Sequence, residues 1–136
     1  MFKLIKILGG RINHGEPRRV NVFTPAEAIP AGTPISIVDD TVSVIEGDQE
    51  LYVTHILEVE TKPSQKEITV TDVLPGMVFS APFSGSITDY AIGSEYIIEG
   101  GKLSSELVSL RGAGAVVYDI PEREDAKELL VTFRVN

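Results

Sequence analysis

The sequence predicts an all-β fold, a small single-domain barrel or sandwich of short antiparallel strands. An extended N-terminal arm and at most one short helical turn complete the prediction. Apolar residues alternate with polar ones over short stretches, and glycine and proline clusters separate these stretches at intervals typical of β-proteins. The chain has 136 residues, 43% of them apolar and none of them cysteine, so one domain can bury a core without disulfides.

In the first half of the chain, alternating apolar residues predict strands over 2–8, 20–24, 35–37, 42–44 and 51–60. Asp39-Asp40 lies between the third and fourth of these segments and predicts a tight hairpin turn. Thr24 is followed by Pro25 and, three residues on, by Glu27, which is the spacing of a helical N-cap. One helical turn is therefore expected over residues 25–30.

The stretch from Ile68 to Leu107 is the most strongly patterned part of the chain. Strands are expected over 68–74, 77–79, 95–98, 102–103, 113–120 and 129–135. Pro75-Gly76 predicts a turn, because proline presets φ and glycine accepts the left-handed conformation. Gly100-Gly101 predicts a second hairpin.

Two parts of the chain resemble each other at a spacing of 61 residues. The shared positions in the first part are Gly32, Ile35, Ile37, Asp39-Asp40 and Val42. Their counterparts are Gly93, Tyr96, Ile98, Gly100-Gly101 and Leu103. Two copies are too few for a solenoid, and two hairpins of similar build within one barrel or sandwich account for the match.

Charge divides the chain into a basic N-terminal arm and first strand (residues 1–19) and an acidic β-rich body (residues 20–136). The arm has a net charge of +4, whereas the whole chain has −8. A body this acidic repels phosphates, so nucleic acid is not an expected partner. The arm is suited to an acidic protein surface or to the body of a neighbouring copy, unless its cations are merely solvated. No apolar run is long enough to span a membrane.

The sequence carries no catalytic motif, so an enzyme is not expected, and neither is a cofactor. His14 and His55 are the only histidines and lack the companions of a zinc site. The pair Asp39-Asp40 is explained by turn chemistry, and the acidic segment 122–125 resembles a solvated loop more than a calcium loop. No metal site is therefore expected.

The opening MFKLIKILGGRINHGEP resembles the start of the small head decoration (cement) proteins of tailed bacteriophages. The segments IPAGTPISIVDDTVSV, VLPGMVFSAPFSGSITDYAIGSEYIIEGGKLSSEL and GAVVYDI…DAKELLVTFRVN are similar to later parts of that family. Residues 51–67 are longer and more charged than in the family, and Gly76 stands where a polar residue is usual. The resemblance thus covers nearly the whole chain by patterning and a few anchor residues.

The resemblance implies a structural virion protein, made in the host cytoplasm, that binds the outer surface of the capsid. Its partner would be the major capsid protein, and it would form a homo-oligomer, such as a trimer, on the capsid lattice. Extended N-terminal residues would add a strand to the capsid protein, and arginines would pair with its carboxylates. The expected contact residues are Phe2, Leu4, Ile7, Arg11, Arg18 and Arg19.

The alternative is a small β-barrel binding module, such as a host-surface or glycan adhesin, or another virion component such as a connector or fibre base. Selective binding to expanded capsid shells would separate the first interpretation from the second. Because the charge divides the chain into arm and body, deletion of residues 1–12 is expected to leave a soluble fold that no longer binds shells.

Overall fold

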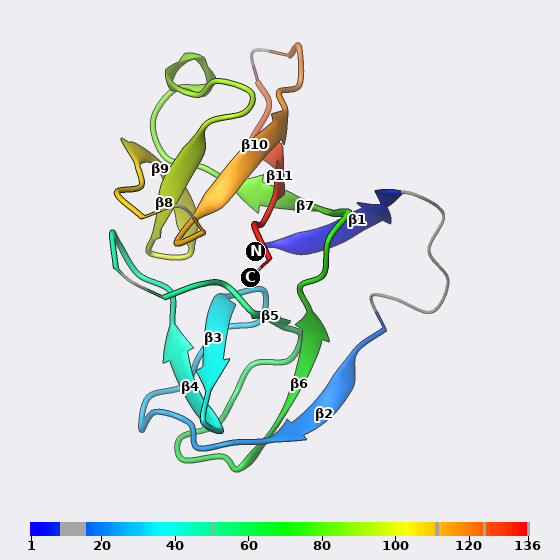
Figure 1. Cartoon of the computed structure of the whole chain (residues 1–136), viewed down its shortest axis with the longest axis vertical. Helices are drawn as coiled ribbons and strands as arrows, with labels where there is room; N and C mark the ends of the chain where they lie inside the picture. The colour runs from blue at the N-terminus through cyan, green and yellow to red at the C-terminus, as the bar shows by residue number, and fades with distance from the viewer. Residues whose placement is uncertain (9–15, 50, 111, 124, 136) are drawn as a thin grey trace.

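A computed structural model describes residues 1–8, 16–49, 51–110, 112–123 and 125–135. The predicted all-β class is confirmed: two antiparallel sheets without a closed barrel make up the described chain, consistent with a sandwich. Figure 1 shows one sheet above the other. Within these residues no helix has the length and apolar character needed to cross a membrane.

The six-stranded sheet, here called sheet A, has the strand order β1-β7-β11-β10-β8-β9. Its strands are β1 (Lys3–Ile7), β7 (Met77–Pro82), β11 (Glu128–Thr132), β10 (Ala115–Asp119), β8 (Glu95–Glu99) and β9 (Lys102–Leu107). The five-stranded sheet B has the order β2-β6-β5-β3-β4. Its strands are β2 (Arg18–Asn21), β6 (Glu67–Asp72), β5 (His55–Leu57), β3 (Pro34–Val38) and β4 (Thr41–Val44).

Both predicted hairpins are present, and their turns share one conformation. Asp39 and Asp40 have φ of 51° and 60°, and Gly100 and Gly101 have φ of 59° and 75°. Two successive residues with positive φ match the right-handed twist of the flanking strands. Aspartate tolerates this conformation because its short side chain can bond locally to the backbone, so the two turns achieve the same geometry with different residues.

The 61-residue correspondence extends far beyond these hairpins. Without β1, sheet A has the order β7-β11-β10-β8-β9, which is the order of sheet B with every strand number raised by five. The registers correspond as well. Arg18 lies opposite Val70 in sheet B, and Phe79 lies opposite Val131 in sheet A, each 61 residues later. We call residues 18–72 the first repeat and residues 79–133 the second repeat.

Sequence and core follow the same correspondence. Residues 66–71 read KEITVT and residues 127–132 read KELLVT. The core of the first repeat consists of Val22, Ile29, Ile35, Val42, Leu57, Ile68 and Val70. Residues 60 or 61 positions later all belong to the larger core or pack against it: Phe83, Tyr90, Tyr96, Leu103, Val117, Leu129 and Val131. The chain therefore builds one five-stranded plan twice.

The predicted helical turn over residues 25–30 is absent. Thr24 donates its hydroxyl hydrogen to the Gln65 carbonyl instead of capping a helix, and the Ile29 N–H binds Thr61 Oγ1. A 3₁₀ turn, η2 (Ile87–Asp89), forms in the second repeat instead. There Ser86 and Asp89 form a reciprocal capping box.

The predicted long strand over residues 51–60 is reduced to the three residues of β5. This strand lies in the middle of sheet B, and its two apolar residues face different cores. Ile56 belongs to the larger core and Leu57 to the core of the first repeat. A strand buried on both faces shows no alternation of apolar and polar residues, and the expected strand differs from the observed one in its length.

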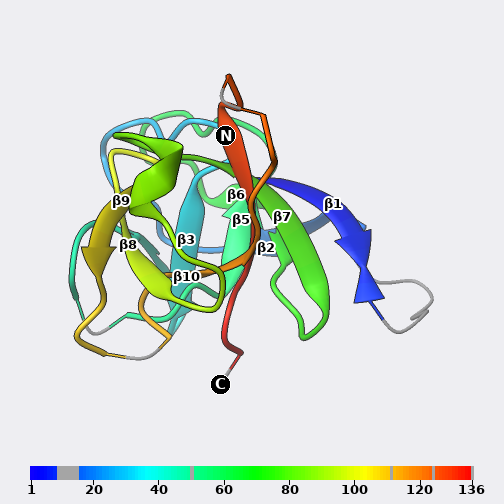
Figure 2. The ribbon, with the colours of Figure 1, turned by 90° about the horizontal axis from the view of Figure 1, so that it is seen from above.

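The N-terminal segment is a strand of sheet A and not a separate arm. β1 pairs antiparallel with β7, and Phe2 is 2% exposed in the larger core. The Phe2 ring lies 5.9 Å from that of Phe133. We therefore correct the expectation for deletion of residues 1–12: it would remove an edge strand together with a core side chain. Figure 2 shows β1 running alongside β7.

Candidate functional site

The structure separates the six expected contact residues into three groups. Phe2 lies in the protein's own core, so its side chain is not on a partner-facing surface. Leu4 and Ile7 are half-buried and pack against that core. Arg11 lies outside the described residues. Arg18 and Arg19 are exposed on β2, an edge strand of sheet B, and make this edge the candidate site.

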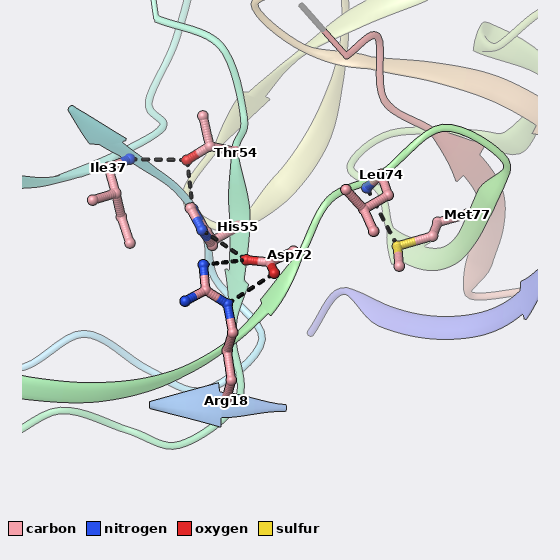
Figure 3. A network of polar contacts seen from close by, with 7 residues as sticks. All are labelled: Arg18, Ile37, Thr54, His55, Asp72, Leu74 and Met77. Atoms are coloured by element: carbon pink, nitrogen blue, oxygen red, sulfur yellow. Dashed lines mark hydrogen bonds and ion pairs between the residues drawn. The ribbon is translucent and has the colours of Figure 1, made fainter. Parts of the chain in front are cut away.

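Arg18 belongs to a polar network at one end of the first repeat (Figure 3). Its Nε and one terminal guanidinium nitrogen donate to the two oxygens of Asp72, at 2.8 and 2.9 Å. The second partner of Asp72 is His55 Nε2, at 2.9 Å, and Thr54 Oγ1 lies 2.7 Å from the other ring nitrogen. The Ile37 N–H donates to the same Thr54 hydroxyl. The network thus connects β2, β6, β5 and β3.

Protonation in the network is set by burial and by the arginine. The hydrogen bond from Arg18 is the largest influence on Asp72 and holds the pKa of its carboxyl below the ordinary value. Burial lowers the pKa of His55, and Arg18 lowers it further, while Asp72 opposes both. A neutral imidazole with its proton on Nε2 satisfies every contact, because it donates to Asp72 and accepts from Thr54.

This network closes the end of the first core with polar side chains. The positions 61 residues after Arg18 and Asp72 are Phe79 and Phe133, whose rings meet edge to face at 5.3 Å in the second repeat. The His55 side chain is 14% exposed. Its partners could not be predicted from the sequence, because Arg18, His55 and Asp72 come together only through strand pairing.

The backbone of β2 presents hydrogen-bonding groups on its outer side. The Val22 N–H donates to the Lys66 carbonyl, so Val22 faces β6. Because these directions alternate along an antiparallel strand, the N–H and C=O groups of Arg19 and Asn21 point away from β6. Among the described residues no strand pairs with this side of β2, apart from the bridge between Phe23 and Thr41 at its end.

Two hollows lie along this outer side. One, of about 390 Å³, is lined by Arg18–Val22 together with Ile37, Asp40 and His55. The next, of about 350 Å³, is lined by Asn21–Phe23, Asp40 and Lys66. The hollows share Asn21, Val22 and Asp40, so they form one groove beside β2. Phe23, at the end of this groove, is 68% exposed.

No other site with recognisable chemistry is found in the described part of the chain. There, no group of three or more histidine, aspartate or glutamate side chains is placed to hold a metal ion. A further hollow of about 440 Å³ lies between residues 25–33 and the β8–β9 turn. Glu46 accepts the Gly100 N–H at this place, and the described residues include no buried side-chain polar atom without a partner.

The chain matches no family model, and no curated protein is significantly similar to it in sequence.

Proposed function

We propose that this chain is a structural protein that binds the outside of a tailed-phage capsid and stabilises contacts between major capsid protein subunits. The observation that carries the proposal is the placement of the N-terminal strands. β1 and β2 are each the first strand of a sheet, so both lie at sheet edges. Edge strands are where proteins add a strand from a neighbouring chain.

The distribution of charge supports a role for the same two sheet edges. Lys3 and Lys6 lie on β1 and Arg18 and Arg19 on β2, and all four side chains are exposed. They give the two edges a positive charge on a protein with a net charge of −8. Such a distribution favours an acidic protein surface and orients the molecule toward it. On a repeating lattice, contacts that are weak one at a time add up through avidity.

Co-sedimentation with capsid shells tests the proposal. Purified protein is mixed with expanded and unexpanded shells, and the bound fraction is measured over a range of salt concentrations. We expect binding to expanded shells only, weakening with salt because exposed charges are screened. Binding to a glycan array without any affinity for shells would reject the proposal in favour of an adhesin.

Arg19→Glu is the sharpest variant for this experiment. Arg19 is 78% exposed and lies 3.7 Å from Glu67, which is 54% exposed, whereas Arg18 also holds Asp72 in place. We expect R19E to weaken shell binding several-fold and to reduce its dependence on salt. Lys127→Glu makes the same change of charge at an exposed position outside both edges and serves as the control. Equal loss with both variants would rule out a specific role for the β2 edge.

A further inference from the structure

The two repeats differ in what lies beside their first strand. In the second repeat, β1 pairs with the outer side of β7, placing Lys3 opposite Ser80. In the first repeat, β2 holds the place of β7, and Arg19 corresponds to Ser80. Among the described residues, nothing stands beside β2 where β1 stands beside β7. The second repeat therefore serves as a template for a strand that the first repeat lacks.

The groove beside β2 lies at this place. Its lining includes Arg19 and Asn21, the two residues whose backbone N–H and C=O groups point outward. β1 lies opposite Ser80 and Val78, whose counterparts beside the groove are Arg19 and Pro17. Because Pro17 has no N–H, an antiparallel strand in the groove would pair two residues further along β2, with Arg19 and Asn21. Val20 and Ile37, both half-buried, offer apolar contacts for alternate side chains of such a strand.

The charges of the groove indicate the chemistry of the occupant. Arg18, Arg19 and Lys66 line it together with the exposed acid Asp40. Asp72 holds Arg18, and Glu67 lies 3.7 Å from Arg19, but the Arg19 side chain is 78% exposed and is therefore accessible to an incoming carboxylate. Strand β1 of a second copy is a poor occupant, since it is cationic and already pairs with β7 of its own chain. Acidic side chains on the incoming strand would complement the arginines.

We propose that the outer edge of β2 binds an extended, acidic segment of a partner protein as an added antiparallel strand. The inference rests on the proposed function in that the shell protein would supply this segment. Peptide binding is measured without shells, so the two ideas can fail separately. Shell binding by a protein that takes no peptide would reject the added strand alone, and peptide binding without shell binding would reject the capsid role alone.

The probe is a fluorescent peptide with the sequence of residues 2–8 in which both lysines are replaced by glutamate. The template strand β1 supplies its length and its apolar positions. Fluorescence anisotropy with the full-length protein should show saturable binding, and the peptide with the original lysines should bind at least tenfold more weakly. Amide exchange at Arg19 and Asn21 should slow when the acidic peptide is added.

Asn21→Pro is the decisive variant, because it removes one outward N–H and leaves the bonds to β6 intact. The equivalent position in the second repeat is already proline: Pro82 lies opposite Glu128 as Asn21 lies opposite Glu67. Proline is tolerated on edge strands in this orientation, so N21P should fold. We expect N21P to weaken peptide binding at least tenfold, and R19E to weaken it several-fold.

Lys127→Glu should leave peptide binding unchanged. Folding of each variant is checked by its circular dichroism spectrum and thermal midpoint. Absence of peptide binding by the wild-type protein, or equal binding by a folded N21P variant, would overturn the inference. Light scattering measures the oligomeric state of the protein. If the wild type is a dimer and N21P is a monomer, the β2 edge binds a second copy, and the proposal of an acidic partner segment is rejected.

Discussion

Arg18 and Phe79 occupy the same place in the two sheets, opposite Val70 and Val131 respectively, yet Arg18 is exposed and Phe79 is buried. The difference follows from β1, which covers β7 and brings Phe2 over the aromatic end of the second core. The first repeat has no such cover among the described residues, and it closes the same end with an ion pair. One backbone plan therefore carries an aromatic end in one repeat and a polar end in the other.

Phe2→Ala should destabilise the protein by about 3 kcal/mol, the usual cost of emptying a buried phenylalanine site. Phe2 is 2% exposed and its ring lies against Phe133. Ile5→Ala, three residues later on β1 and 50% exposed, should change stability by less than about 0.5 kcal/mol. Urea unfolding of both variants measures the difference. An equal free energy of unfolding for the two variants would mean that the buried Phe2 side chain contributes nothing to the core.

Stability should fall as the pH drops below about 6.5, the ordinary pKa of histidine. Because burial lowers the pKa of His55 in the folded protein, the unfolded chain binds a proton at a higher pH than the folded chain does. Protonation therefore favours unfolding through that window. The pKa of Asp72 is also lowered in the folded protein. Below the pKa that Asp72 has in the unfolded chain, its protonation therefore causes a further loss of stability.

His55→Gln isolates the histidine part of this effect. Urea unfolding between pH 7.5 and pH 5 should show a sloping stability for the wild type and a flatter one for H55Q. A wild-type stability that increases on acidification over this range would contradict a neutral, buried imidazole.

Glu95→Ala should cost about 2 kcal/mol, because it leaves buried donors without their acceptor. Glu95 is 7% exposed, accepts the Gly112 N–H at 2.6 Å, and binds Arg134 Nε at 2.8 Å. Glu95→Gln retains an oxygen for the Gly112 N–H and should cost less. Thermal unfolding of the two variants provides the comparison, and a larger loss for E95Q would contradict the role assigned to the backbone contact.

Gly114→Ala should be among the most damaging small substitutions. An added Cβ would lie 2.1 Å from the Tyr96 carbonyl oxygen, a backbone atom that cannot move aside without shifting β8. Forced overpacking of this kind costs about 3 kcal/mol. Gly93→Ala is the matched control, since φ is +88° there but nothing lies within 4 Å. It should cost about 1 kcal/mol from backbone strain alone. Similar losses in both variants would mean that close contact does not explain Gly114.

Much of the fold could be predicted from local signals. Alternation located nearly every strand, and Asp39-Asp40 and Gly100-Gly101 marked both hairpins, because turn chemistry and period-two patterns are local properties. Central strands were harder: Ile56 and Leu57 face two different cores, so β5 has no alternation to detect. The 3₁₀ turn has a readable signal in Ser86 and Asp89, but Thr24 and Glu27 offer the same spacing and form no helix.

The candidate site was predictable only in part. The exposed cations Arg18 and Arg19 follow from composition, and both lie on an exposed edge. The network of Arg18, His55 and Asp72 depends on pairing between β2, β6 and β5, which no local pattern specifies. Phe2 was expected at a surface, because the sequence pattern around an apolar N-terminal residue is the same in an extended arm as in an edge strand. Its burial depends on β7, far away in the sequence.

The position of β1 also affects the order in which the chain can fold during synthesis. Every strand of sheet B has left the ribosome before β7 is complete, so the first repeat can finish its pairing early. β1 is made before all of them but has to wait for Met77–Pro82, the one strand that pairs with it in the described part of the chain. Until then the second core, in which Phe2 is buried, is incomplete, so a segment synthesised before the other described strands is one of the last to pack.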